Sequence, residues 1–562
     1  MSLLFSIRNP LSRSNLSILS SKVQYRSLKS VHSRLFSGTA VASNKLPNLT
    51  LFREAIASAK KLGAKPAIVD INGQYSYGQL LNDVVKLKSQ LTDSDLKEER
   101  VAYLCPNGYN YVVTQWSIWA SGGVAVPLCA SHPPAELEYT ISDSEASIVV
   151  ASPEYADTVK PLADKLGKRF ISFDGFKNSE PIDIKDSDIF DMDESRRAMI
   201  MYTSGTTGKP KGVVSTHNNI KAQVTALTKA WNWTSDDKLL HVLPLHHTHG
   251  VIVALTCGLW SGATVEMMKK FNADSVWNRF MAKERDLSLF MAVPTIYAKL
   301  RDSYHEFSPE KQKEATESCK QFRLMVSGSA ALPTKLLKEW EKISNVKLLE
   351  RYGMTEIGMA LSNPIGDPAL RREGCVGFPL PGVEVRLKAD DGQIVTEEQE
   401  VPGEIQVRGE NVFEEYYNRP EATKETFDEG RWFKTGDIGC INSEGYYRIL
   451  GRASTDIIKS GGYKISALEI EREILDYPGI LDCAVVGPED EEWGQRVAAV
   501  VLVKNNQDIE LQDLKNWASS RLAKYKIPSL LHVYKGDSLP RNVMGKVNKK
   551  QLVKIFDKVK EN

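Results

Sequence analysis

Short apolar runs alternate with amphipathic stretches along most of the chain. The runs at 101–104, 124–127 and 147–150 are typical of buried parallel strands, and the run at 67–70 predicts a further strand. The stretch that opens at 77–81 has the apolar spacing of an amphipathic helix. Helices that alternate with buried strands predict an α/β fold whose sheets are layered with helices.

The pattern changes between residues 383 and 450, where apolar and polar positions alternate. The segments 383–387 and 403–408 therefore predict half-exposed strands of a smaller β-rich region. Further along, a helix at 467–475 and a strand at 483–486 indicate a compact α+β unit. We expect a large N-terminal domain of layered α/β subdomains with a β-rich region, followed by a small C-terminal domain.

Charge and cysteine content narrow the functional class. Lys and Arg number 72 against 71 Asp and Glu, so net charge favours neither nucleic acid nor a membrane surface as a partner. No apolar run is long enough to span a membrane. The seven cysteines are scattered without a Cys-x-x-Cys pair, which indicates free thiols in a reducing compartment. We expect small-molecule partners, and the oligomeric state is left open.

The first 53 residues differ from the rest because they contain no Asp or Glu. Within the first 40 of them, set among many serines, stand Arg8, Arg13, Lys22, Arg26, Lys29 and Arg34. This composition is typical of an organellar transit peptide, and Arg-Leu-Phe at 34–36 resembles a mitochondrial processing site. We predict that residues 1–40 form a mitochondrial transit peptide that directs the chain to the matrix. The alternative is a basic tail without a targeting role.

One loop carries most of the chemical information. Residues 202–212 read Tyr-Thr-Ser-Gly-Thr-Thr-Gly-Lys-Pro-Lys-Gly, between apolar runs that predict a strand–loop–strand hairpin. Glycines let the backbone approach a ligand closely, and successive N–H groups with Ser and Thr hydroxyls form an anion-binding concavity. Lysine adds a mobile positive charge. The loop therefore predicts a polyphosphate site, although the glycine spacing is not that of the ordinary P-loop.

Four further blocks follow this loop, at 350–356 (Glu-Arg-Tyr-Gly-Met-Thr-Glu), 434–437 (Lys-Thr-Gly-Asp), 451–464 and 539–546. In this order the five blocks resemble the motifs of the adenylate-forming superfamily, which contains acyl- and aryl-CoA synthetases, luciferases and peptide-synthetase adenylation domains. The resemblance covers the chain from about residue 46 to its end. It implies an N-terminal domain at 46–451, a hinge at 452–456 and a mobile C-terminal domain at 457–562.

The resemblance also implies a role for individual residues. ATP would be bound by Thr203, Ser204, Gly205, Thr206, Thr207, Gly208, Lys209, Tyr352, Asp437 and Arg452. Mg²⁺ would be held by Thr207 and Glu356, since carboxylates are hard oxygen ligands. Coenzyme A would pass near Gly461, Gly462 and Lys464. The catalytic residues would be Lys546, Thr355 and Glu356, with the Lys546 ammonium bridging the attacking carboxylate and the α-phosphate.

The acid pocket is implied between segments 245–250, 327–331 and 350–356. Its candidate residues are His247, Thr248, His249, Ser327, Ser329, Arg351 and Met354. Such polar and basic walls do not suit a long-chain or aromatic acid, whereas the Arg351 guanidinium could hold the second carboxylate of a short diacid. These segments resemble those of malonyl-CoA synthetases. The resemblance implies ATP-dependent ligation of malonate to coenzyme A through malonyl-adenylate, with AMP and pyrophosphate as by-products.

Several alternatives stay open from the sequence. The acid could be methylmalonate, oxalate or a short-chain fatty acid. Arg351 could instead form a structural ion pair with Glu350 or Glu356. The chain could also be a nucleotide-binding relative without catalysis, but such a protein would be expected to lack Lys546, Glu356 or Asp437, and all three are present.

Overall fold

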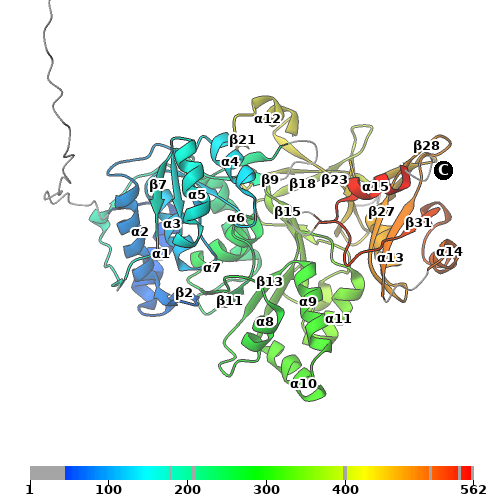
Figure 1. The fold of residues 1–562 in the computed structure, drawn as a ribbon, viewed down its shortest axis with the longest axis horizontal. Coiled ribbons are helices and arrows are strands. Elements are labelled where there is room, and N and C mark those ends of the chain that lie inside the picture. The colour runs from blue at the N-terminus through cyan, green and yellow to red at the C-terminus, as the bar shows by residue number, and fades with distance from the viewer. Residues whose placement is uncertain are drawn as a thin grey trace, which may run out of the picture. The chain divides into compact units, whose positions relative to one another are not determined.

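The computed structural model describes residues 45–177, 179–203, 209–395, 401–504, 509–541 and 546–557. The predicted transit peptide lies outside these residues. Within them the fold is mixed α/β, with a large N-terminal domain and a smaller C-terminal domain, as the sequence predicted (Figure 1). No described helix is both long and apolar enough to cross a membrane.

The first sheet has seven strands within the described residues, in the order β21-β10-β9-β5-β4-β6-β7. Their bounds are β21 Glu415–Tyr416, β10 Lys211–Thr216, β9 Arg197–Thr203, β5 Val124–Pro127, β4 Arg100–Leu104, β6 Ile148–Ala151 and β7 Arg169–Ser172. Strands β4, β5 and β6 are parallel and fully or almost fully buried, which confirms the prediction from their continuous apolar runs. Strands β9 and β10 are antiparallel and form the predicted hairpin.

The second sheet has nine strands within the described residues, in the order β17-β16-β15-β14-β13-β11-β12-β2-β3. Their bounds are β17 Phe378–Pro379, β16 Gly358–Ser362, β15 Leu349–Met354, β14 Leu324–Ser327, β13 Leu289–Ala292, β11 Lys238–His241, β12 Thr264–Met267, β2 Pro66–Asp70 and β3 Gly73–Ser76. The parallel strands β13, β14 and β15 bring the ends at Ser327 and Glu350 into register, so two predicted acid-pocket segments meet at one edge.

Helices cover these sheets and bury one large hydrophobic core. Helices of this domain include α2 Tyr77–Leu91, α3 Tyr109–Ala120, α5 Pro153–Lys165, α6 His217–Ala230, α8 Ala273–Phe280, α9 Pro294–His305 and α11 Thr334–Ser344. Helix α2 begins with a capping box in which Ser76 and Gln79 exchange side-chain to backbone hydrogen bonds. Its apolar face joins the core, together with the fully buried Trp116 and Trp119 of α3.

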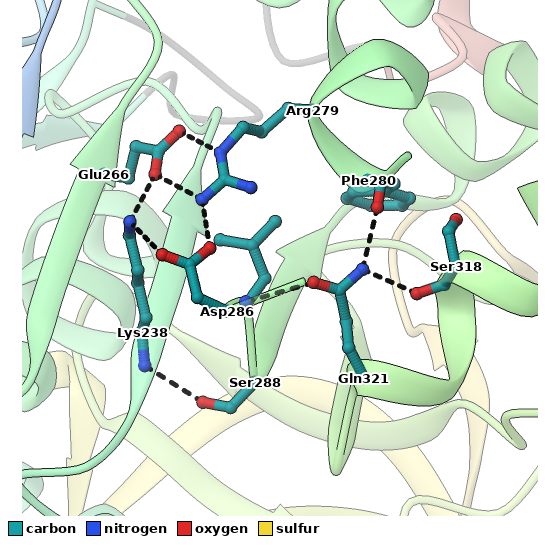
Figure 2. A network of polar contacts seen from close by, with 9 residues as sticks. Lys238, Glu266, Arg279, Phe280, Asp286, Ser288, Ser318 and Gln321 are labelled. Atoms are coloured by element: carbon teal, nitrogen blue, oxygen red, sulfur yellow. Dashed lines mark hydrogen bonds and ion pairs between the residues drawn. The ribbon is translucent and has the colours of Figure 1, made fainter. Parts of the chain in front are cut away.

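A charged network fixes one end of the second sheet to helix α8. Arg279 of α8 pairs with Glu266 of β12 at 2.5 Å and with Asp286 at 2.5 Å, and Lys238 of β11 pairs with the same two carboxylates (Figure 2). Shared ion pairs of this kind hold long side chains in a single arrangement. The network therefore joins α8 to the neighbouring strands β11 and β12.

The β-rich region is a third sheet with the described order β19-β18-β20-β23-β22 and with β24 paired to β23. The bounds are β19 Ile394–Val395, β18 Glu384–Lys388, β20 Gly403–Arg408, β23 Trp432–Ile441, β22 Phe427–Asp428 and β24 Tyr447–Arg452. Strand β20 is more buried than its alternating pattern predicted, because it lies between β18 and β23. Gln406 is only 1% exposed, and its side chain is hydrogen-bonded to Arg386 and Asp428.

The C-terminal domain contains two small sheets within the described residues. The first has β25 Ile457–Ser460, β26 Tyr463–Ser466, β28 Glu489–Asp490 and β29 Gly494–Gln495, and the second has β27 Ile480–Val486, β30 Ala498–Val503 and β31 Leu530–Val533. Helices α13 Ala467–Ile474, α14 Leu511–Ser519 and α15 Lys549–Asp557 accompany them (Figure 1). The helix and strand expected at 467–475 and 483–486 are confirmed as α13 and β27. The buried clusters of this domain begin at Ile458, whereas those of the N-terminal domain end at Tyr447.

Candidate active site

A large cleft, with a volume of about 3330 Å³, is lined by described residues from each of the five sequence blocks. Its walls include residues from the hairpin β9–β10, from the 350–356 block, from 434–437, from the start of the C-terminal domain and from the segment that carries Lys546. Residues Ser204–Gly208 of the predicted polyphosphate loop lie outside the described residues. Thr203 and Lys209, which flank that loop, both line the cleft.

Tyr352, Asp437 and Arg452 form a connected set at the predicted nucleotide site. The Tyr352 hydroxyl donates to Oδ2 of Asp437 at 2.5 Å, and Nε of Arg452 pairs with Oδ1 of Asp437 at 2.8 Å. Asp437 and Arg452 face each other across β23 and β24, so the strand register fixes this contact. Burial raises the pKa of the Asp437 carboxyl, while the Arg452 guanidinium acts in the opposite direction. The set presents a carboxylate acceptor beside a tyrosine ring.

Glu356 is buried in the same cleft and is hydrogen-bonded by a residue that the sequence analysis did not select. The Tyr416 hydroxyl donates to Oε1 of Glu356 at 2.9 Å. Burial raises the pKa of Glu356, because a carboxylate removed from water is costly without a compensating cation or hydrogen bond. Tyr416 lies in the two-residue strand β21, which pairs with β10 of the β9–β10 hairpin. No motif marks it in the sequence, so only the sheet pairing reveals its place.

Arg351 is a buried cation in the cleft that has no carboxylate partner among the described residues. Its side chain is 4% exposed, and its Nη2 donates to Oγ of Ser329 at 3.5 Å, the limit of a hydrogen bond. Its Nε has no hydrogen-bond partner, and it forms no ion pair with any carboxylate among the described residues. Burial alone lowers the pKa of Arg351, to about 9, so the guanidinium remains cationic at neutral pH. A buried cation without an anion is costly, and an anionic ligand would relieve that cost.

The alternative of a structural ion pair from Arg351 to Glu350 or Glu356 is therefore wrong. Glu356 is bonded to Tyr416, and Glu350 accepts a hydrogen bond from the backbone N of Gly374 at 3.3 Å. Gly328 packs directly on the guanidinium, since a Cβ there would lie 2.4 Å from Cζ of Arg351. The guanidinium is thus held by close packing rather than by a counter-ion.

The two histidines of the predicted acid pocket, His247 and His249, are polar but uncharged near pH 7. His249 lies at the start of η2, the π-helix His249–Thr256, and its Nδ1 is 3.2 Å from Oγ of Ser329. Desolvation lowers the pKa of His247 to about 3 and that of His249 well below its usual value. Both imidazoles are therefore neutral near pH 7. The expected basic wall is corrected accordingly: Arg351 carries the charge, and these two histidines are polar.

The other predicted acid-binding residues also lie in the cleft. These are Thr248, Ser327 and Met354, and the predicted catalytic Thr355 lies beside them. The buried hydroxyl of Ser327 has no hydrogen-bond partner, and Nε2 of His249 has none either. Unsatisfied buried polar atoms are uncommon in native proteins and point to a missing ligand or water. The pocket therefore combines one cation with neutral donors and acceptors, which suits a small, polar anion.

The C-terminal domain contributes Lys546 to the cleft but not the predicted coenzyme A segment. Lys546 is open to solvent within the cleft, yet the surrounding walls lower its pKa by desolvation, and the Arg452 guanidinium lowers it further. The carboxylates of Asp437, Asp456 and Glu356 act in the opposite direction, which places this ammonium near the Asp437–Arg452 pair. The described residues of the motifs expected to act in the first half-reaction thus line one cleft.

Gly461, Gly462 and Lys464 lie elsewhere, in the turn between β25 and β26. The two glycines have φ values of +54° and +81°, a conformation that other residues adopt only with strain. Lys464 forms an ion pair with Asp390 of the N-terminal domain. None of the three lines the cleft in this arrangement.

Comparison with known proteins shows which enzyme family the chain belongs to. The AMP-binding enzyme family matches residues 56–417, and the AMP-binding enzyme C-terminal domain matches residues 469–546. The chain belongs to the AMP-binding enzyme family. A mitochondrial malonate–CoA ligase from Bos taurus is 47% identical over 526 residues, covering 88% of this chain and 89% of the relative.

Two further relatives have similar coverage. A malonate–CoA ligase from Arabidopsis thaliana is 39% identical over 566 residues, covering 93% of this chain and 92% of the relative. The crystal structure of ATP-bound MatB from Rhodopseudomonas palustris matches with a TM-score of 0.79 and 33% identity, covering 90% of this chain and 99% of that chain. The predicted adenylate-forming class and its fold are confirmed.

Proposed function

We propose that the chain is an ATP-dependent malonate–CoA ligase that works in the mitochondrial matrix. The observation that carries the choice of acid is the buried Arg351 cation, which has no anionic partner among the described residues. A planar guanidinium can bind a carboxylate through two parallel hydrogen bonds, so it would hold the distal carboxylate of malonate. The malonate–CoA ligase names of the relatives support the same substrate.

In the first half-reaction, one carboxylate oxygen of malonate attacks the α-phosphorus of ATP and pyrophosphate leaves. Tyr352 would lie against adenine, and Asp437 would accept hydrogen bonds from the ribose hydroxyls. The Lys546 ammonium would stabilise negative charge between the attacking carboxylate and the α-phosphate. Thr355 would contact that phosphate.

Mg²⁺ fits the donors that are described. The Glu356 carboxylate is buried with a raised pKa, so a hard cation beside it would stabilise its charged form. Thr207, the second predicted ligand, lies outside the described residues. When bound, Mg²⁺ would neutralise phosphate charge during transfer. The Tyr416 hydrogen bond keeps the carboxylate oriented for that role.

In the second half-reaction, the thiol of coenzyme A attacks the acyl carbon of malonyl-adenylate and AMP leaves, giving malonyl-CoA. The predicted hinge at 452–456 would rotate the C-terminal domain, which withdraws Lys546 and brings the turn that contains Gly461, Gly462 and Lys464 to the cleft. The position of that turn outside the cleft, while Lys546 lines it, supports such an alternation.

The test is an assay of purified protein with ATP, Mg²⁺ and coenzyme A against a panel of acids. Malonate should give the highest kcat/KM, with methylmalonate, oxalate, acetate and a medium-chain fatty acid as comparators. The reaction is identified by the mass of the thioester product and by release of one AMP for each thioester formed. A preference for any monocarboxylate would overturn the assignment to malonate, whereas inactivity with every acid would overturn the ligase itself.

A further inference from the structure

The ammonium of Lys549 lies between two carboxylates in the C-terminal domain. Its Nζ is 2.6 Å from Oδ1 of Asp456 and 2.7 Å from Oε1 of Glu471. All three side chains are largely buried, with exposed fractions of 11% for Lys549, 15% for Asp456 and 13% for Glu471. The carboxylates raise the pKa of Lys549 to about 12, against the effect of desolvation.

The three residues come from segments that are distant in sequence. Asp456 ends the predicted hinge, and its Oδ2 accepts a hydrogen bond from the backbone N of Arg452 at 3.0 Å. Glu471 lies in α13 and also accepts from the backbone N of Val485 at 2.7 Å. Lys549 is the first residue of α15. One ammonium therefore ties the hinge, α13 and α15 together.

Lys546 is only three residues before Lys549. The segment between them is anchored through the backbone N of Asn548, which donates to the carbonyl of Pro540 at 2.8 Å. Helix α15 is anchored at the other side by the buried Leu552 and Phe556. Lys549 is thus a charged side-chain anchor three residues from Lys546, and it reaches the same hinge segment whose Arg452 pairs with Asp437 in the cleft.

We propose that Lys549 is a positioning residue that couples Lys546 to the hinge and so sets the arrangement that makes the adenylate. The proposal rests on the function given above. A paired ammonium buried between two carboxylates holds its geometry strictly, because any displacement leaves a buried charge uncompensated. A displacement of about 1 Å at a catalytic group can cost roughly 10²-fold in rate, so loss of this anchor would be felt at Lys546. Lys549 itself does not touch the substrates.

The experiment compares Lys549→Met, Lys549→Arg and Lys554→Met in the full-length protein. Lys554 is an exposed lysine of the same helix and serves as the matched control. Each variant is assayed for malonate-dependent exchange of pyrophosphate into ATP and, separately, for thioester formation from supplied malonyl-adenylate. Lys549→Met should slow exchange by roughly 10²-fold and change thioester formation less than about threefold. Lys549→Arg should restore most of the exchange, and Lys554→Met should match the wild type.

A double variant separates positioning from simple loss of structure. In a Lys546→Ala background, where exchange is already lost, adding Lys549→Met should change thioester formation from supplied malonyl-adenylate less than about threefold, because the group that it positions is gone. Exchange at the wild-type rate in Lys549→Met would overturn the proposal, as would equal losses in both half-reactions. If the wild type itself shows no malonate-dependent exchange, the proposed function is wrong. If the wild type exchanges pyrophosphate and Lys549→Met does so at the same rate, only the role given to Lys549 is wrong.

Discussion

The hydroxyl of Tyr352 donates a hydrogen bond to Oδ2 of Asp437 at 2.5 Å, although 85 residues separate them. Asp437 is joined in turn to Arg452, which lies at the start of the predicted hinge. This chain of contacts links the residues expected at adenine and ribose to the segment about which the C-terminal domain would turn. Nucleotide occupancy and domain position are therefore expected to influence each other.

Arg351→Ala should weaken the use of malonate by roughly 10²-fold or more in kcat/KM, since removing one partner of a buried charge pair costs about 2–5 kcal/mol. Acetate has no distal carboxylate, so any activity with acetate should change little. The measurement is kcat/KM for both acids in wild type and variant. Equal losses on the two acids would mean that Arg351 only supports the fold.

Lys546→Ala should abolish the release of pyrophosphate from malonate and ATP, because the ammonium is expected to act in the step that forms the adenylate. Thioester formation from supplied malonyl-adenylate should be largely retained. Both rates can be followed in the same preparation, which controls for folding. A variant that still exchanges pyrophosphate at the wild-type rate would rule out this role for Lys546.

Tyr416→Phe should slow adenylate formation by roughly ten- to a hundredfold, because a hydrogen bond to a charged group contributes about 1.5–3 kcal/mol. The Glu356 carboxylate would lose its 2.9 Å donor, and a higher Mg²⁺ concentration should be needed for half-maximal exchange. Tyr417→Phe is the matched control, since the Tyr417 hydroxyl donates to Glu145 instead. Identical Mg²⁺ profiles for both variants would contradict the role given to Tyr416.

His217 predicts a dependence of stability on pH. Desolvation lowers its pKa to about 3 in the folded protein, whereas unfolded histidine titrates near 6.5. Between these values the unfolded state binds a proton that the folded state does not, so the free energy of unfolding falls as the pH falls through this window. His217→Gln removes this effect. The variant's free energy of unfolding should therefore fall by about 1 kcal/mol less between pH 6 and pH 5 than that of the wild type.

Urea unfolding of the wild type and the His217→Gln variant provides this measurement. The same pair compared between pH 7.5 and 8.5 is the internal control, because His217 is neutral in both states there. A variant whose acid-side slope equals that of the wild type would show that His217 does not contribute to this pH dependence.

Deleting residues 1–40 should leave ligase activity intact in vitro and leave the protein in the cytosol. The predicted leader lies outside the described residues and precedes every site motif. Its basic residues would be drawn toward a negative matrix, with about 2.3 kcal/mol available per charge per 100 mV. Cell fractionation and an assay of the truncated protein check both statements. Entry of the truncated protein into mitochondria would contradict the targeting role.

The sequence by itself determined the class of fold and the list of candidate residues. Continuous apolar runs such as 101–104 and 124–127 were predicted as buried parallel strands and are confirmed as β4 and β5. Local patterns succeed here because a strand buried on both faces must be apolar at every position. The motif residues could be named for a similar reason, since phosphate binding requires glycines, hydroxyls and lysine close together in the chain.

Only the tertiary structure decided which residues of the predicted acid pocket carry a charge. The sequence shows His247, His249 and Arg351 as three basic residues, but burial neutralises the two histidines and leaves Arg351 charged. The structure also shows two contacts that the local sequence does not predict. Tyr416 bonds to Glu356, and Lys549 pairs with Asp456 and Glu471. Desolvation and ion pairing depend on which segments meet in space, and that is fixed by strand register and packing rather than by local pattern.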